Sequence, residues 1–208
     1  MTRKTKSSLA VTAVSMTILG LLPAYLEAFT ISGPSDAPTL LLGDSIIVNK
    51  AAYALHLPYT NIRVISTGKP NRGDLVSFRV PKLGTLGIKR IAALPGETIE
   101  IHENVIIING VKLAYNPKPA ADFEWVPAVH HLGSEIAIEK GLGMNHYLTY
   151  SPNGSPVRNF PPTAIPPGHY FLLGDHRDNS NDSRMFGPVS EDMILGKVIL
   201  NLNPKPKP

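Results

Sequence analysis

The sequence predicts a mainly β protein, in which an antiparallel β-sheet domain with a smaller β insertion lobe follows one amino-terminal transmembrane helix. Three observations support this fold class. Short apolar and β-branched runs recur between turn residues, as expected for antiparallel sheets. The 20 Pro and 17 Gly among 208 residues favour turns over long helices. One uncharged stretch near the amino terminus has the length of a membrane span.

The amino-terminal segment has the composition of a membrane anchor. Residues 7–26 carry no charge and are long enough to cross the hydrocarbon layer as a helix. The residues before them are basic and include Arg3, Lys4 and Lys6. The positive flank predicts that residues 1–6 are cytoplasmic, that residues 7–28 form a single-pass anchor in the inner (cytoplasmic) membrane, and that the rest of the chain is exported.

A cleaved signal peptide is the alternative interpretation of this segment. Its most apolar part ends at Leu22, and Pro23 then interrupts the run. The Leu-Glu-Ala at residues 26–28 lacks the small-x-small pattern of a cleavage site. We therefore favour a retained helix.

Short strands are predicted along the rest of the chain, punctuated by Gly or Pro. The candidates are residues 40–48 (a turn, then a strand), 62–65, 75–80, 88–94, 98–101, 105–108, 111–113, 169–173 and 195–200. Asn109 and Gly110 lie between two of these runs and predict a hairpin, because both residues tolerate the positive φ of a tight hairpin turn.

The strand pattern divides the chain into regions. Residues 29–97 and 167–203 are expected to form the main β domain, and residues 98–166 an insertion lobe. Within this lobe the chain is rich in proline and contains the only tryptophan, Trp125, so we expect a small hydrophobic cluster of its own. Residues 204–208 are predicted to be a disordered tail.

The composition excludes several kinds of chemistry. Cysteine is absent, which rules out disulfides, a thiol nucleophile and thiolate metal sites. The 20 Lys and Arg are scattered along the chain, which argues against a nucleic-acid surface. The seven histidines show no metal-ligand spacing, and the adjacent His130 and His131 would point to opposite faces of a strand. We therefore expect no metal and no organic cofactor.

Four segments carry polar residues in a specific order. They are Ser35-Asp-Ala-Pro-Thr-Leu-Leu-Leu-Gly-Asp44, Arg72-Gly-Asp-Leu-Val-Ser-Phe-Arg79, Ile88-Lys-Arg-Ile-Ala-Ala-Leu-Pro-Gly-Glu97 and Gly174-Asp-His-Arg-Asp-Asn-Ser-Asn-Asp-Ser-Arg-Met-Phe-Gly187. No Gly-x-Ser-x-Gly elbow supports a Ser-His-Asp triad. On these four motifs the chain resembles the bacterial type I signal peptidases, over about residues 30–201 apart from the insertion.

The resemblance implies a serine protease with a Ser-Lys dyad. Ser35 would be the nucleophile and Lys89 the general base. The resemblance also implies that Ser180 hydrogen-bonds to the lysine amine and orients it, while Asp182 and Arg184 pair to hold their loop. The backbone N–H of Ser35 would contribute to the oxyanion hole.

The chemistry of such a dyad sets a condition on the lysine. Lys89 can remove the proton of a serine hydroxyl only when its amine is neutral. Free lysine has a pKa of about 10.4, so a base useful near neutrality needs a depression of roughly 3 units, which burial has to supply. Ile88, Ile91 and Leu94 are suited to desolvate the amine. Without the other motifs, Lys89 and Arg90 would be interpreted as an exposed basic pair on an edge strand.

Three positions depart from the family pattern. Asp36 stands where a methionine is usual, and an inward carboxylate would favour ammonium over amine at Lys89, so we expect Asp36 to point to solvent. Gly33 stands where many members have a serine that completes the oxyanion hole, and Ser32 is the candidate replacement. His176 replaces an asparagine, and we expect little consequence.

By resemblance, the protein would remove signal peptides from exported preproteins at small-x-small sites near the membrane surface. Exported preproteins and membrane lipid are the expected partners, and nucleic acid is not. One alternative is a specialised peptidase that matures pilin or another dedicated substrate. The other is a catalytically silent homologue that binds signal peptides, and Gly33 and Asp36 are the residues that favour it.

Overall fold

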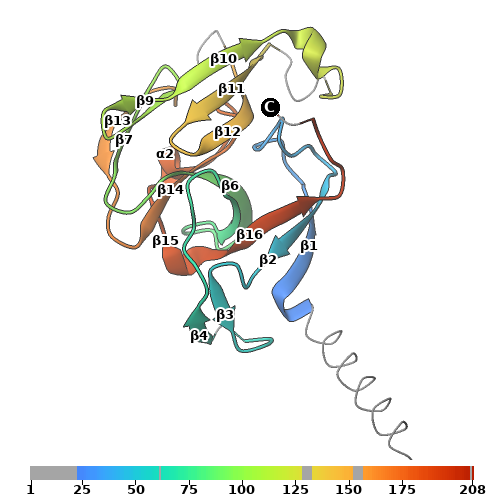
Figure 1. The fold of residues 1–208 in the computed structure, drawn as a ribbon, viewed down its shortest axis with the longest axis vertical. Coiled ribbons are helices and arrows are strands. Elements are labelled where there is room, and N and C mark those ends of the chain that lie inside the picture. Colours follow the sequence, from blue (N-terminus) through green and yellow to red (C-terminus); the bar gives the residue numbers. More distant parts are fainter. Residues whose placement is uncertain (1–22, 61, 128–132, 152–156, 207) are drawn as a thin grey trace, which may run out of the picture.

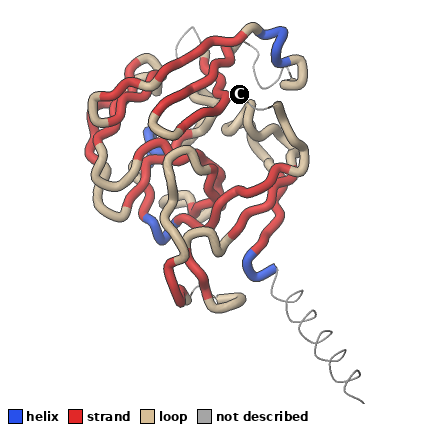
Figure 2. Tube along the Cα trace, viewed as in Figure 1, coloured by secondary structure: helices blue, strands red, loops and turns tan. Residues whose placement is uncertain are grey.

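The computed structural model describes residues 23–208, with the exception of residues 61, 128–132, 152–156 and 207 (Figure 1). Strands dominate this part of the chain, and the helices in it are short (Figure 2). All pairs of named strands in it are antiparallel. The predicted mainly β, antiparallel fold class is confirmed.

The largest sheet has seven strands in the order β1-β2-β16-β5-β6-β14-β15. Their bounds are β1 (Leu26–Thr30), β2 (Ser45–Asn49), β16 (Ile194–Asn201), β5 (Leu75–Arg79), β6 (Leu86–Ala93), β14 (His169–Leu173) and β15 (Val189–Ser190). Strand β16, near the carboxy-terminal end of the chain, lies inside this sheet, because it pairs with β2 on one side (Figure 1) and with β5 on the other. Strand β6, which carries Lys89, lies between β5 and β14.

Two smaller sheets come from the predicted insertion. One has the order β13-β7-β8-β9, and the other β10-β11-β12. The bounds are β7 (Thr98–His102), β8 (Val105–Ile108), β9 (Val111–Lys112), β10 (Ala114–Lys118), β11 (Glu135–Gly141), β12 (Met144–Tyr150) and β13 (Phe160–Ala164). The predicted hairpin joins β8 to β9, where Asn109 and Gly110 have φ values of 49° and 80°.

The expectation that the insertion has a hydrophobic cluster of its own is wrong. Phe123 and Val126 pack in one cluster with Ala37 and Leu41, which belong to the segment around Ser35, and Trp125 packs against this cluster. The reason is that the edge of the insertion has apolar residues to bury and the Ser35 segment offers the matching apolar surface. The boundaries of a main domain and a lobe stay a prediction.

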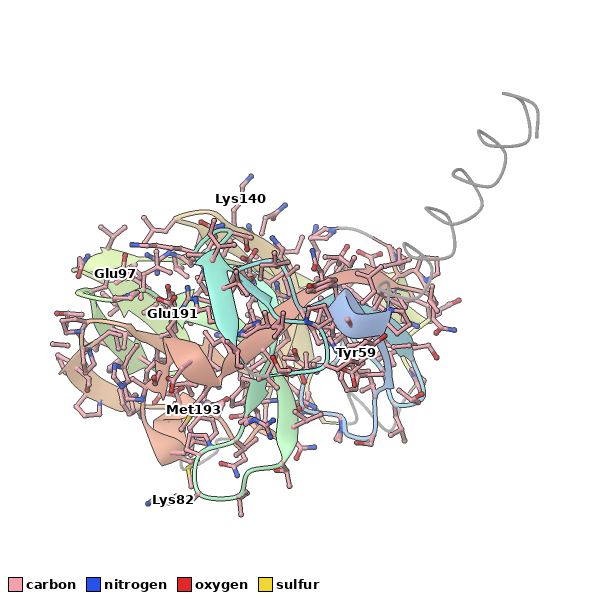
Figure 3. All side chains as sticks on the ribbon, turned by 90° about the horizontal axis from the view of Figure 1, so that it is seen from below. Tyr59, Lys82, Glu97, Lys140, Glu191 and Met193 are labelled. Atoms are coloured by element: carbon pink, nitrogen blue, oxygen red, sulfur yellow. The ribbon has the colours of Figure 1, made fainter. Side chains whose placement is uncertain are left out.

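The remaining elements are short. A ribbon of β3 (Ala54–His56) and β4 (Arg63–Ser66) extends at the end of the molecule where β1 begins (Figure 1). The short helices are η1 (Ala120–Phe123), α2 (Ser183–Phe186) and η3 (Glu191–Met193). Lys140 of β11 and Lys82 of the β5–β6 loop project outward at opposite edges of the molecule (Figure 3).

The predicted anchor falls largely on residues 1–22, which lie outside the described residues. From residue 23 onward, the described helices are all too short or too polar to cross a membrane. Residues 23–25 are helical, but Leu26–Thr30 form β1 and pair with β2. The predicted end of the anchor at residue 28 is therefore wrong, because the backbone groups from residue 26 onward bond to a neighbouring strand.

The predicted disorder of the tail is also wrong at one residue. The Lys205 ammonium lies 3.0 Å from Oδ1 of Asp44, whose side chain is buried beside the sheet. An ion pair with a buried carboxylate holds this residue to the domain. His130 and His131 lie outside the described residues.

Candidate active site

Ser35 lies in a turn that precedes β2. The backbone N–H of Ala37 donates to the carbonyl of Pro34 at 3.1 Å, which closes the turn. The carbonyl of Ser35 accepts from the backbone N–H of His176 at 3.0 Å, which ties the turn to the loop after β14. Ala37 is completely buried, so the turn is anchored by packing as well as by hydrogen bonds.

Lys89 lies on β6 opposite Val76 of β5, and only 5% of the residue is exposed. Its Nζ is 2.5 Å from Ser35 Oγ and 2.6 Å from the carbonyl oxygen of Ile88. The structure therefore brings together the two residues that were predicted to form a dyad, although 54 positions separate them.

Asp36 does not point to solvent, and this expectation is wrong. The residue is 3% exposed, and its carboxylate oxygens lie 3.1 and 3.4 Å from Lys89 Nζ. Oδ2 of Asp36 also accepts the hydroxyl proton of Ser35 at 2.8 Å. Burial raises the pKa of the Asp36 carboxyl, although the Lys89 charge pulls this pKa down. A buried carboxylate is tolerated here because a cation and a hydroxyl satisfy it.

The expected hydrogen bond between Ser180 and Lys89 is absent. Lys89 has three N–H donors, and these face Ser35 Oγ, the Asp36 carboxylate and the Ile88 carbonyl. Ser180 Oγ is buried and has no hydrogen-bond partner in the described part of the chain. The inward turn of Asp36 therefore explains why Ser180 is not needed to saturate the amine.

Gly174 allows the Ser35 turn to approach the loop after β14. A Cβ at this position would lie 2.4 Å from the Ser35 carbonyl oxygen and 2.2 Å from Ser180 Oγ. Both distances are too short for any side chain, so only glycine permits this packing.

Asp182 and Arg184 form the predicted pair. Arg184 Nε and one terminal nitrogen donate to the two Asp182 oxygens, each at 2.8 Å. Asp182 also accepts from the backbone N–H of Gly174 at 3.1 Å, while Arg184 donates to the carbonyl of Arg177 at 2.6 Å. The pair thus connects both ends of the loop and fixes Gly174 beside the Ser35 turn.

The oxyanion side of the site matches the family pattern only in part. The backbone N–H of Ser35 makes no hydrogen bond to the described residues. A Cβ added at Gly33 would meet no atom within 4 Å, so the space for the missing side chain is open. Ser32 is exposed, and no hydrogen bond links it to Ser35 in the parts of the structure that are described.

A buried ion pair lies beside the dyad, and no role for it was predicted from the sequence. Arg90 donates to both oxygens of Asp175, at 2.8 and 2.6 Å. Thr39 donates to Asp175 at 2.5 Å, so the Ser35 turn is attached to the same carboxylate. Burial alone would raise the pKa of Asp175, but the Arg90 charge and these hydrogen bonds lower it to about 2. Arg90 and Asp175 both belong to the four motifs, and this was the signal in the sequence that could have indicated their pairing.

The ion pair continues into the β11–β12 hairpin. His146 Nε2 lies 3.4 Å from Asp175 Oδ1 and 3.4 Å from Glu139 Oε2, and Arg177 pairs with Glu139 at 2.8 Å. Burial, followed by the charge of Arg90, lowers the pKa of His146 to about 4. Glu139 and His146 are direct cross-strand partners. The positions of the two residues on either side of the Gly141-Leu-Gly143 turn determine this pairing.

Other sites offer less to chemistry. A cavity of about 570 Å³ lies between β1, the β3–β4 ribbon and β5, and neither Ser35 nor Lys89 lines it. Among the described residues, no group of three or more His, Asp or Glu side chains is arranged to hold a metal ion.

A mainly β fold that buries a lysine amine against a serine hydroxyl defines the kind of site that a Ser-Lys hydrolase needs. The model of the family described as signal peptidase, peptidase S26, matches residues 4–202. The chain belongs to this family, which confirms the resemblance indicated by the four motifs.

Individual relatives agree with this assignment. Signal peptidase I of Pseudomonas aeruginosa is 35% identical over 200 residues, which cover 87% of this chain and 66% of that protein. The chain thus spans just under two thirds of that relative. Signal peptidase IB of Staphylococcus aureus strain COL is 32% identical over 196 residues, which cover 92% of this chain and 84% of that protein.

A solved structure of a signal peptidase I from Enterococcus faecalis V583 matches with a TM-score of 0.40 and 28% identity, covering 64% of this chain and 100% of that chain. A superposition this loose adds nothing to the family assignment.

Proposed function

We propose that this protein is a serine endopeptidase that removes signal peptides from exported preproteins, with Ser35 as nucleophile and Lys89 as general base. Family membership supports the substrate class. The observation that carries the catalytic roles is the 2.5 Å separation of Lys89 Nζ and Ser35 Oγ in a site where Lys89 is 5% exposed.

The reaction follows from the two groups. Neutral Lys89 takes the hydroxyl proton as Ser35 Oγ bonds to the carbonyl carbon of the scissile peptide. The backbone N–H of Ser35 stabilises the negative charge on the carbonyl oxygen. The C–N bond then breaks, and the leaving amine takes the proton from Lys89. Water attacks the resulting ester, Lys89 accepts its proton, and Ser35 Oγ regains a proton as the carboxylic acid product leaves.

The supporting residues position this pair. In the proposed enzyme, Asp182 and Arg184 hold the loop that contacts the Ser35 turn, through the bonds of Asp182 to Gly174 and of Arg184 to Arg177. They do not touch the reacting atoms, so their effect on activity would be indirect.

A membrane anchor before β1 would be part of the function. The uncharged run that follows the basic residues 1–6 would cross the inner membrane once and leave the β domain on the exported side. Exported preproteins and the enzyme would then share the membrane surface, which raises their effective concentration. Membrane lipid is accordingly a proposed partner.

The test uses the full-length protein in detergent with a preprotein that has a small-x-small site. Ser35→Ala and Lys89→Ala should each lower cleavage by at least about 10³-fold, because a nucleophile and its base act as a unit. Lys112→Ala is the matched control, since Lys112 is an exposed lysine on β9. Cleavage that survives either site substitution refutes the dyad.

A silent signal-peptide-binding homologue is the second candidate, and the ion pair between Asp36 and Lys89 favours it. A silent homologue would cleave no preprotein at any pH but would still bind a signal peptide. Binding without cleavage, measured with the same preprotein across pH 6 to 10 or so, would decide for this candidate.

A further inference from the structure

The Asp36 carboxylate, the Ser35 hydroxyl and the Lys89 amine form a closed triangle of hydrogen bonds. The Ser35 hydroxyl donates to Asp36 at 2.8 Å, so Lys89 is the donor in its 2.5 Å contact with Ser35 Oγ. Lys89 also donates to Asp36 at 3.1 Å and to the Ile88 carbonyl at 2.6 Å. A lysine that donates three hydrogen bonds has no lone pair directed at the serine proton. The triangle is therefore a resting arrangement, in which the Lys89 amine acts only as a donor.

Lys89 is the charge that favours an ionised Asp36 carboxylate, whereas burial and the charge of Asp175 oppose it. Lys89, on β6, is the one cation within 4 Å of the Asp36 carboxylate in the described structure. The neighbouring cation on β6, Arg90, instead donates to both oxygens of Asp175. Asp175, after β14, is a second anion that repels Asp36. His176, in the same loop, contacts the Ser35 turn through its backbone N–H, which donates to the Ser35 carbonyl oxygen. With Asp36 only 3% exposed, water screens little of its interaction with Lys89.

We propose that Asp36 is a positioning residue of the dyad, which holds Ser35 and Lys89 together at rest and raises the pH at which Lys89 becomes a base. This inference rests on the proposed function for its kinetic consequence. To accept the serine proton, Lys89 must first lose a proton of its own, and an ionised carboxylate 3.1 Å away opposes that loss. An opposite charge at this distance moves a pKa by about 1 to 3 units.

The decisive variant is Asp36→Asn, which keeps the size and an acceptor oxygen but removes the charge. The acidic limb of the kcat/KM profile for preprotein cleavage should move to lower pH by about 1 to 3 units. Asp36→Glu keeps the charge and should leave the limb within about half a unit of wild type. Asp44→Asn is the matched control, because Asp44 is also a buried carboxylate paired with a lysine, Lys205. The acidic limb of the Asp44→Asn profile should not move.

A second readout is independent of cleavage. The Lys89 side chain, labelled with ¹³C at Cε and assigned by comparison with Lys89→Arg, should titrate at lower pH in Asp36→Asn than in wild type by about 1 to 3 units. If the NMR titration shifts while neither protein cleaves a preprotein, the inference stands and the proposed activity fails. If cleavage depends on Ser35 and Lys89 but both the limb and the titration stay in place, the activity stands and the inference is overturned.

Discussion

Substitution of Gly174 by alanine tests how closely the Ser35 turn must approach the loop after β14. The new Cβ would lie 2.4 Å from the carbonyl oxygen of Ser35 and 2.2 Å from Ser180 Oγ. Contacts of a Cβ below 3.0 Å are essentially never seen, so the Ser35 backbone must retreat by at least 3.0 − 2.4 = 0.6 Å. Rotation can move Ser180 Oγ away, but it moves neither Ser180 Cβ, at 2.5 Å, nor the Ser35 carbonyl, which is bonded to the His176 N–H at 3.0 Å.

The expected effect follows from the size of this shift. Lys89 Nζ lies 2.5 Å from Ser35 Oγ, so a displacement of the turn breaks the contact that proton transfer needs. A misplacement of about 1 Å can cost about 10²-fold in rate, so we expect kcat to fall about 10- to 100-fold. Overpacking at Gly174 should also destabilise the fold by about 1–3 kcal/mol.

The assay is the steady-state cleavage of a preprotein by the full-length protein, with thermal unfolding measured in parallel so that rates refer to folded enzyme. A double variant, Gly174→Ala with Ser180→Gly, removes the side-chain clash but leaves the backbone clash with Ser35. It should remain as slow as the single variant. A single variant with kcat within about threefold of wild type, or a double variant with full activity, would refute the reasoning.

Three further substitutions test other parts of the site. Gly33→Ser places a hydroxyl in open space and should raise kcat about tenfold or more if the oxyanion hole lacks a donor; an unchanged kcat would mean that the hole is already complete. Arg90→Met leaves Asp175 buried without its cation and should cost about 3–5 kcal/mol in urea unfolding, and a loss below about 1 kcal/mol would contradict the role of this pair. Because the pKa of His146 is about 4 in the fold against an ordinary 6.5, the unfolded chain takes up a proton first as pH falls. Wild type should therefore lose about 3 kcal/mol of stability between pH 6.5 and 4, whereas His146→Gln should show a loss smaller by most of that amount, and an equal loss in both would be the contrary result.

The elements of the fold could be predicted because their causes are local. Turn chemistry at Asn109 and Gly110 requires positive φ at both residues, and the structure has it. Alternation in β2 places Ile46 and Val48 in the core, as the β-branched pattern indicated. The assembly of strands into sheets is not local: β16 enters between β2 and β5, and no feature of residues 194–201 specifies that neighbourhood.

The position of Asp36 could not be predicted from the chain because the residue sits in a turn. In a strand, neighbouring side chains point to opposite faces, so Ser35 and Asp36 would be on different sides. In the turn before β2, both side chains reach the same amine. The charge of Asp36 was the reason for expecting its side chain in solvent. This expectation is wrong because Lys89 supplies a buried partner for the carboxylate. The pairing of Glu139 with His146 was predictable from hairpin register, but only once the turn at residues 141–143 had been recognised.

Gly33 and Asp36 alter different quantities, although both flank the same serine turn. A missing oxyanion donor raises the barrier of the chemical step whenever the base is neutral, so it lowers the plateau of the rate profile. A carboxylate beside Lys89 changes the fraction of enzyme that carries a neutral amine, so it moves the pH at which the plateau begins. An enzyme with both changes would look silent in an assay at one neutral pH. Because the second effect reverses at alkaline pH and the loss of a nucleophile does not, only the full pH profile distinguishes a shifted peptidase from a homologue without activity.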